Sequence, residues 1–354
     1  MNSIISPTCL CCVTLLIVFG AAHSATGERV NGDGSLQAYS GHAPHPNLLD
    51  GYSVRPPWKV AGVDYAIGPL ELTKFKKPTK ENLPPGVSIG SEALHIVGNN
   101  VTLDGYDLSG LTVMIEDNAT GKITISNCRA IGVVIRSTVQ ATADLHIDHC
   151  DLDGGGMSSD PNFQTIKVWC SLALKYSWIR NSPGGIQGSA SLSAVYNLLE
   201  GFAWAPGAHA NAIYIRGTTT STDTTIIAYN TLYSQDVRNH QGFPVGIGAA
   251  IGFFGDGGNF YNSIISNNTI ISSMPGAASY LIGFYVLAEE KAVGGVIESN
   301  YLASVNGFNR RDSGAFGAFY PGSRGEVRAI YRGNVDMNTG NIIKGLGSER
   351  MKGN

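Results

Sequence analysis

The sequence is poor in charged residues, and neither sign of charge is in clear excess. Only 14% of its 354 residues are charged, and the formal net charge is -3. A protein that holds a nucleic acid needs a strongly basic surface facing the phosphates, so no nucleic acid partner is expected. The one basic run comprises Lys74, Lys76, Lys77 and Lys80. We interpret it as a solvated loop face in preference to a binding patch.

Long apolar runs are also scarce, and the single example lies at the start of the chain. Residues 9–22 are almost entirely apolar and lead into the small-residue stretch A-A-H-S-A. A membrane anchor is the competing interpretation. The run of about 14 residues argues against it, because a spanning helix needs roughly 20. We interpret residues 1–25 as a secretory signal peptide, cut near Ser24 or Ala25. The mature protein is then expected to be secreted or periplasmic, with no membrane span.

Cysteine is too rare for a disulfide framework. Three of the six cysteines, at positions 9, 11 and 12, belong to the signal segment. The three that remain, Cys128, Cys150 and Cys170, form an odd set in a protein expected to be exported. Such a number argues against disulfide pairs as the basis of the fold.

What the sequence does contain is a repeat. T-I-I-A-Y-N-T-L-Y-S at 225–234 and S-I-I-S-N-N-T-I-I-S at 263–272 share the pattern apolar-x-apolar-x-x-N-x-apolar. The same frame recurs at intervals of 20 to 38 residues. Its turn position is occupied, in order, by Tyr106, Cys128, Cys150, Ser177, Asn197, Asn230, Asn268, Asn300 and Asn334.

Each repeat unit is too short for a pair of helices, and its apolar residues alternate with a period of two. We therefore expect coils of short strands, in which each strand pairs in parallel with the same strand of the next coil. Equal turn residues then stack, and the asparagines form a hydrogen-bonded ladder. A β-sandwich or propeller would need Asn-Gly hairpins or periods of 40 or more, which are scarce here.

This pattern resembles the single-stranded right-handed parallel β-helix of the pectin-lyase-like superfamily over about residues 90–340. The resemblance implies an all-β solenoid formed by residues 91–354 with their C-terminal tail. Residues 26–90 are expected to be an N-terminal cap and lead-in, because an open terminal coil exposes strand edges and apolar interior. Cys128 and Cys150 would lie on neighbouring coils, as buried free thiols or, less naturally given their parallel directions, as a disulfide.

Units longer than a minimal coil must send out loops, and these are expected to wall a groove on one side of the solenoid. Alternation along the neighbouring strands points four side chains into that groove: Lys167 and Trp169 from one strand, Tyr214 and Arg216 from another. The predicted loops are residues 151–164, 200–210, 234–246 and 304–318.

Aromatic rings beside cations suit a sugar polymer, because rings pack on pyranose C–H groups and cations pair with uronate carboxylates. A polysaccharide is thus the expected partner. Arg310, Arg311 and Tyr320 follow in the last loop and its strand. The predicted substrate-binding residues are Trp169, Tyr214, Arg216, Arg310, Arg311 and Tyr320.

Candidate catalytic residues are His209, Asp236, His240, Lys167 and Asp153. A histidine beside an aspartate suits proton transfer, although a histidine that only anchors a loop is the plainer alternative. Asp153 belongs to a glycine-rich acidic stretch that suits an acid–base carboxylate, a calcium ligand or a simple turn residue. Calcium is the only cofactor that these residues suggest, and we assign no metal ligands.

The expected activity is that of a polysaccharide lyase or a glycoside hydrolase. The superfamily's lyases use an Arg or Lys base, commonly with Asp-bound calcium, and its polygalacturonase-like hydrolases use paired aspartates. Neither pattern stands out here, so the resemblance implies a substrate class more than a reaction. One alternative is a non-catalytic polysaccharide-binding, adhesin or matrix protein. Another is a phage-type spike, which the predicted signal peptide disfavours.

Overall fold

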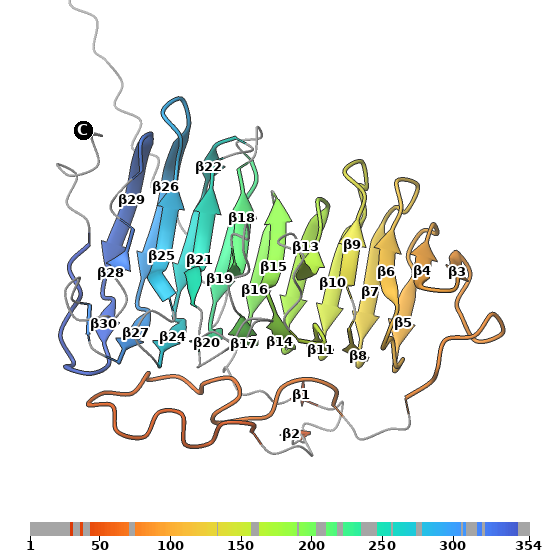
Figure 1. The fold of residues 1–354 in the computed structure, drawn as a ribbon, viewed down its shortest axis with the longest axis horizontal. Coiled ribbons are helices and arrows are strands. Elements are labelled where there is room, and N and C mark those ends of the chain that lie inside the picture. Colours follow the sequence, from red (N-terminus) through yellow and green to blue (C-terminus); the bar gives the residue numbers. More distant parts are fainter. Residues whose placement is uncertain are drawn as a thin grey trace, which may run out of the picture.

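The computed structural model shows an elongated stack of coils, each built from short strands and turns (Figure 1). No helix occurs among the residues that it describes. These residues are 29–30, 36–37, 43–70, 75–132, 134–156, 163–189, 191–202, 210–217, 222–234, 246–255, 258–273, 278–305, 307–308, 317–320 and 323–345.

The strands form three sheets that run the length of the stack, and nearly all of their pairings are parallel. Sheet A consists of β3 (Val87–Ile89), β4 (Ala93–Ile96), β6 (Thr112–Ile115), β9 (Val134–Ser137), β12 (Gln164–Lys167), β15 (Gly184–Ser189), β18 (Asn211–Arg216), β21 (Ile247–Phe254), β25 (Ala278–Tyr285) and β28 (Gly317–Phe319). Sheet B consists of β5 (Thr102–Asp104), β7 (Lys122–Ser126), β10 (Asp144–Asp148), β13 (Ser171–Lys175), β16 (Leu192–Val195), β19 (Thr225–Ala228), β22 (Phe260–Tyr261), β23 (Ser263–Ser266), β26 (Lys291–Glu298) and β29 (Glu326–Arg332). Sheet C consists of β8 (Arg129–Ile131), β11 (Asp151–Asp153), β14 (Trp178–Ser182), β17 (Leu198–Phe202), β20 (Thr231–Ser234), β24 (Thr269–Ser272), β27 (Tyr301–Ser304) and β30 (Val335–Asp336). A separate antiparallel pair is formed by β1 (Arg29–Val30) and β2 (Leu36–Gln37).

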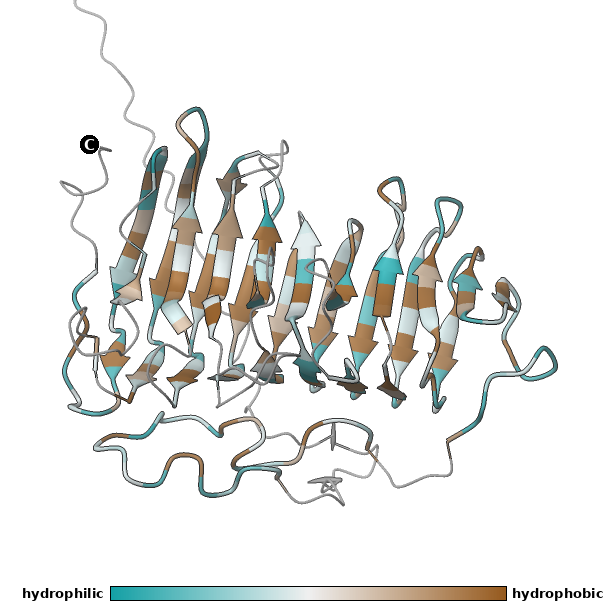
Figure 2. Ribbon diagram, in the orientation of Figure 1, coloured by the Kyte–Doolittle hydropathy of each residue, from teal (hydrophilic) through white to brown (hydrophobic). Residues whose placement is uncertain are grey.

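The chain visits sheets A, B and C in turn, and this order confirms the predicted parallel β-helix. Alternation with a period of two builds its interior. In β7, Ile123 and Ile125 are fully buried, and the register sets Leu145 and Ile147 of β10 directly beside them. Figure 2 shows the resulting apolar bands across the strands. Repetition of this arrangement from coil to coil produces one continuous core.

The predicted ladder of turn residues is confirmed. From Asn230 onward, each asparagine side-chain oxygen accepts hydrogen bonds of 2.9 to 3.1 Å from the backbone N–H and the Nδ2 of the asparagine one coil earlier. The same Nδ2 also donates to a backbone carbonyl of the preceding coil, as Asn268 does to Ile227. The column contains Asn197, Asn230, Asn268, Asn300 and Asn334, all of them buried.

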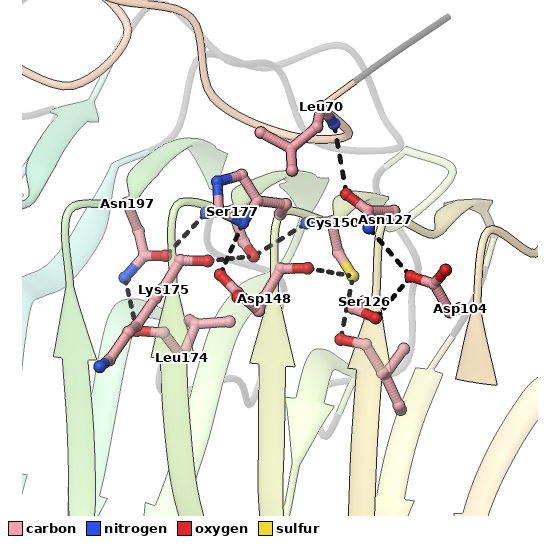
Figure 3. Close-up of polar contacts among 12 residues, drawn as sticks. Leu70, Asp104, Ser126, Asn127, Asp148, Cys150, Leu174, Lys175, Ser177 and Asn197 are labelled. Carbon is pink, nitrogen blue, oxygen red and sulfur yellow. Dashed lines mark hydrogen bonds and ion pairs between the residues drawn. The ribbon is translucent and has the colours of Figure 1, made fainter. Parts of the chain in front are cut away.

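Smaller residues continue the column through the earlier coils (Figure 3). The backbone N–H of Ser177 donates to Asn197 Oδ1 at 2.9 Å, and the N–H of Cys150 donates to Ser177 Oγ at 3.1 Å. Further along, the N–H of Tyr106 lies 3.4 Å from the sulfur of Cys128. All three cysteines of the described chain are free and buried. Burial raises the pKa of the Cys150 thiol well above its ordinary value.

The residue before each ladder position adopts a left-handed conformation, which turns the chain from sheet B into sheet C. His149, Tyr176, Tyr196 and Tyr229 occupy four successive turns, with φ between 48° and 61°. Their rings stack at centroid distances of 4.9 to 5.1 Å. Burial raises the pKa of Tyr176 to about 12. The aromatic stack offsets backbone strain that non-glycine residues rarely tolerate.

The lead-in segment, which we define as residues 43–70 and 75–77, follows the outside of the stack from the last coil to the first (Figure 1). At one end, the N–H of Val54 donates to the carbonyl of Met337 at 3.2 Å. At the other end, the N–H of Lys76 donates to the carbonyl of Gly105 at 2.9 Å. After this segment the chain enters the first coil, where β3 pairs antiparallel with β4.

A second apolar cluster joins the lead-in segment to the outer face of sheet C. Trp58 packs edge-on against Tyr229 and Tyr301, with centroid distances of 6.0 and 5.1 Å. The hydroxyl of Thr231 donates to the carbonyl of Ala61 at 2.7 Å. The buried members of this cluster are Leu49, Val60, Val63, Ile271, Ala303 and Met337. Sheet C is therefore buried on both faces along this stretch.

We expect the lead-in segment to detach in acid near the first coil. The nearly buried Asp107 accepts from Arg129 at 2.9 Å and pairs with Lys77 at 3.0 Å. Burial alone would raise its pKa, but hydrogen bonds from Ser109, Lys77 and Arg129 outweigh burial and hold the pKa well below its usual value. A carboxyl whose pKa is depressed by folding stabilises the fold above its unfolded pKa, near 4, and loses that effect as pH falls. Asp107→Asn should therefore destabilise the protein at neutral pH and flatten its stability profile below about pH 4. Thermal unfolding against pH measures this, and a wild-type slope in the variant would contradict it.

Candidate functional site

The outer face of sheet A carries the residues that the sequence pointed toward a groove. Ile166, Ile213 and Ile215 are almost completely buried in the core, as the alternation expected along these strands requires. Lys167 and Tyr214 therefore point outward from β12 and β18. One outward row runs in register through Met114, Arg136, Lys167, Gln187, Tyr214, Gly252 and Gly283.

A second outward row lies two residues further along each strand. Ser189, Arg216, Phe254 and Tyr285 are register partners on β15, β18, β21 and β25. The guanidinium of Arg216 lies 4.9 Å from the ring centroid of Trp169. This cation–π contact links two residues predicted to bind substrate, and it fixes a planar cation beside an indole ring.

Aromatic rings of the two rows form a column along the axis. Phe254 stacks on Tyr214 at 4.6 Å and on Tyr285 at 4.4 Å, and Tyr285 stacks on Tyr320 at 4.0 Å. Glycine makes the space for it, because a Cβ on Gly252 would lie 2.5 Å from the ring of Phe254. Burial raises the pKa of Tyr285. The inner rings cover one another's faces, so they offer a ligand mainly their edges.

Two cations sit side by side on the first row. Arg136 of β9 and Lys167 of β12 are register partners on adjacent parallel strands, which are spaced about 4.8 Å apart. The Nε of Arg136 is buried and has no hydrogen-bond partner within the described part of the chain. Like charges at such a distance repel, and a buried donor without a partner is costly. An anion bound beside Arg136 would give that Nε a partner.

Asp153 lies elsewhere. It belongs to β11 of sheet C, where its carboxylate accepts from Arg180 Nε at 3.1 Å and from Asn181 Nδ2 at 2.9 Å. Its other oxygen accepts from the N–H of Gly155 at 2.8 Å. The structure thus does not bring Asp153 together with Lys167 and Trp169. Its hydrogen bonds are typical of a turn carboxylate that fixes local structure.

Five predicted site residues, His209, Asp236, His240, Arg310 and Arg311, lie outside the residues that the structure describes. Most residues of the predicted groove loops also lie outside the described ranges. In chain order, each of these four loops follows a strand of sheet C and precedes a strand of sheet A. Of the predicted residues that the structure describes, Lys167, Trp169, Tyr214, Arg216 and Tyr320 lie on or beside the outer face of sheet A.

Sequence reasoning missed Arg136, Phe254 and Tyr285. A signal for the aromatic pair was present, because I-G-F-F at 251–254 and I-G-F-Y at 282–285 repeat a glycine two residues before an outward ring. These two segments pair in register. Arg136 has no such signal, because its strand, V-I-R-S, belongs to a minimal coil without a long loop.

Within the described residues, no group of three or more His, Cys, Asp or Glu side chains has an arrangement suited to a metal ion. In the same ranges, no helix has the length and apolarity needed to cross a membrane. Comparisons with protein-family models, curated proteins and solved structures give no match to this chain.

Proposed function

We propose that the protein is an exported carbohydrate-active protein that holds an anionic polysaccharide along the outer face of sheet A. The observation that carries this proposal is the pair of register-matched cations, Arg136 and Lys167, on that face. Arg216 lies on the same face and is held against Trp169. Cations along a flat sheet suit a polymer with a charge on each sugar, such as a polyuronate.

We further propose that the chain is a member of the pectin-lyase-like superfamily and acts as a polysaccharide lyase or a glycoside hydrolase. Elimination from a uronate requires a base that removes the proton next to the carboxylate. A carbon–carbon double bond then forms, the glycosidic C–O bond breaks, and the leaving oxygen takes up a proton. Cations that neutralise the uronate carboxylate make that proton more acidic. Arg136 and Lys167 are the side chains that would supply this effect. Hydrolysis requires two carboxylates on opposite sides of the glycosidic bond. Asp236 is the candidate from the sequence for one of them.

Non-catalytic binding is the second candidate function, and the aromatic column favours it. Its rings are already stacked on one another. A surface of this kind is rigid before the ligand arrives, which suits adhesion or matrix attachment without turnover. Incubation with uronate and neutral glycans separates the two functions. Ultraviolet absorbance of unsaturated products reports elimination, new reducing ends alone report hydrolysis, and binding without either product supports the second function.

Replacing Arg136 with alanine should weaken binding of a polyuronate by about tenfold or more, because a charged hydrogen bond to the ligand is lost. Titration calorimetry at low and moderate salt measures the effect, which salt should reduce. Lys175→Ala, at an exposed position of sheet B, is the matched control and should bind normally. Equal affinity of wild type and Arg136→Ala, or equal binding of neutral glycans, would remove the cation pair from the proposal.

A further inference from the structure

The last strand of sheet B, β29, is an edge in the described part of the chain, because its only partner there is β26. The N–H of Glu326 donates to the carbonyl of Glu290, and the carbonyl of Arg332 accepts from the N–H of Ser299. Even-numbered residues of β29 therefore direct their backbone groups toward the stack. Because successive residues of a strand alternate, Val327, Ala329 and Tyr331 direct their N–H and C=O groups away from it.

We propose that two copies of the protein associate end to end, with their β29 strands paired antiparallel about a twofold axis through Ala329. In this register Ala329 faces its own copy, and Val327 faces Tyr331 of the other protomer. These are the residues whose backbone groups point outward, so each pair exchanges two hydrogen bonds. An isologous pairing of this kind closes after two copies and leaves no free edge.

Side chains on both faces of β29 fit this register. On the outer face, Glu326 falls opposite Arg332 of the other protomer, and symmetry repeats the pair. Within its own chain Glu326 pairs with Arg328 and Arg332 pairs with Glu298, so the contacts between protomers would extend these ion pairs. Oppositely charged residues directly across an antiparallel pair attract each other. On the inner face, Val327 is buried in the core of its own chain, and Ala329 and Tyr331 are partly buried against that core. Their pairing would set apolar side chains of the two protomers beside one another across the paired strands.

The chain's own tail leaves this edge unpaired in the described residues. Ile342 forms a bridge to Val335 of β30, and Ile343 packs on the core. Gly345 lies against the side chain of Tyr331, which points inward toward Phe319. A second copy fits the edge because the strand is complementary to itself in this register, with Glu326 and Arg332 of the two protomers opposite one another.

The molar mass of the full chain, measured by light scattering on a sizing column at micromolar concentration, should be that of a dimer. Ala329→Pro removes only the N–H that points to the free edge, and proline is tolerated at such positions. The variant should therefore fold, with a thermal midpoint near that of wild type, but elute as a monomer. A monomeric wild type overturns the proposal. A dimer that forms only after residues 346–354 are removed overturns it too, because the full chain would then not associate.

Charge reversal tests the register independently of proline. Glu326→Arg and Arg332→Glu each place like charges opposite one another, and each variant alone should associate about tenfold more weakly. An equimolar mixture of the two variants restores opposite charges at both positions and should form the dimer again. Lys175→Glu, on sheet B away from the edge, is the matched control. A mixture that stays as dissociated as its components would refute the proposed register.

Discussion

Replacing Asn268 with alanine is expected to lower the free energy of unfolding by about 3 kcal/mol. Asn268 is fully buried, and its side-chain oxygen accepts from both the backbone N–H and the Nδ2 of Asn230. Its own Nδ2 donates to Asn300 and to the carbonyl of Ile227. Alanine leaves several of these groups buried without a partner, and each such group carries a desolvation penalty.

Denaturant unfolding followed by circular dichroism measures this loss as a lower midpoint with an unchanged slope. Asn118→Ala is the matched control, since Asn118 is an exposed asparagine in a turn of the same solenoid. Both variants should bind the same glycans as wild type. If Asn268→Ala is no less stable than Asn118→Ala, the amide column does not carry the stability that its hydrogen bonds indicate.

Replacing Trp58 with alanine is expected to cost about 3 kcal/mol and to release the lead-in segment from sheet C. The indole meets the rings of Tyr229 and Tyr301, and its loss opens a cavity between the segment and the stack. Hydrogen exchange should show faster exchange at Gly62 and Gly68, whose N–H groups are bonded in the wild type.

Asp50→Ala provides the comparison for Trp58→Ala, because Asp50 is an exposed residue of the same segment. Its substitution should leave exchange and stability unchanged. If Trp58→Ala left the exchange of the lead-in segment at the wild-type rate, the contacts of Trp58 would not be what holds that segment in place.

The stack was predictable from the sequence because it repeats. A single frame, read at Asn230 and again at Asn268, fixes both the turn and the register, and each further unit tests it. The lead-in segment has no such regularity. Trp58 contacts Tyr229, and Ala61 accepts from Thr231, at sequence separations that no pattern encodes, so the second apolar cluster appears only in three dimensions. Its cover over sheet C therefore could not be anticipated.

The candidate site was predictable only in part, for the same physical reason. Alternation correctly turned Lys167 and Arg216 outward, because strand period is a local property. Which sheet a residue joins depends on where the coil bends, and Asp153 fell on sheet C because β11 begins directly after the ladder turn. The pairing of Arg136 with Lys167 depends on the register between coils, which the length of a loop does not indicate.

The path of the lead-in segment also has a consequence for the order of events during synthesis. Ser53 hydrogen-bonds to Asn338, its partner 285 positions later. Residues made near the beginning therefore cannot take their final places until the closing coil exists. Contacts between such distant parts of a chain slow the search for the native state. The lead-in segment is therefore expected to dock late in folding, after the coils that it crosses have formed.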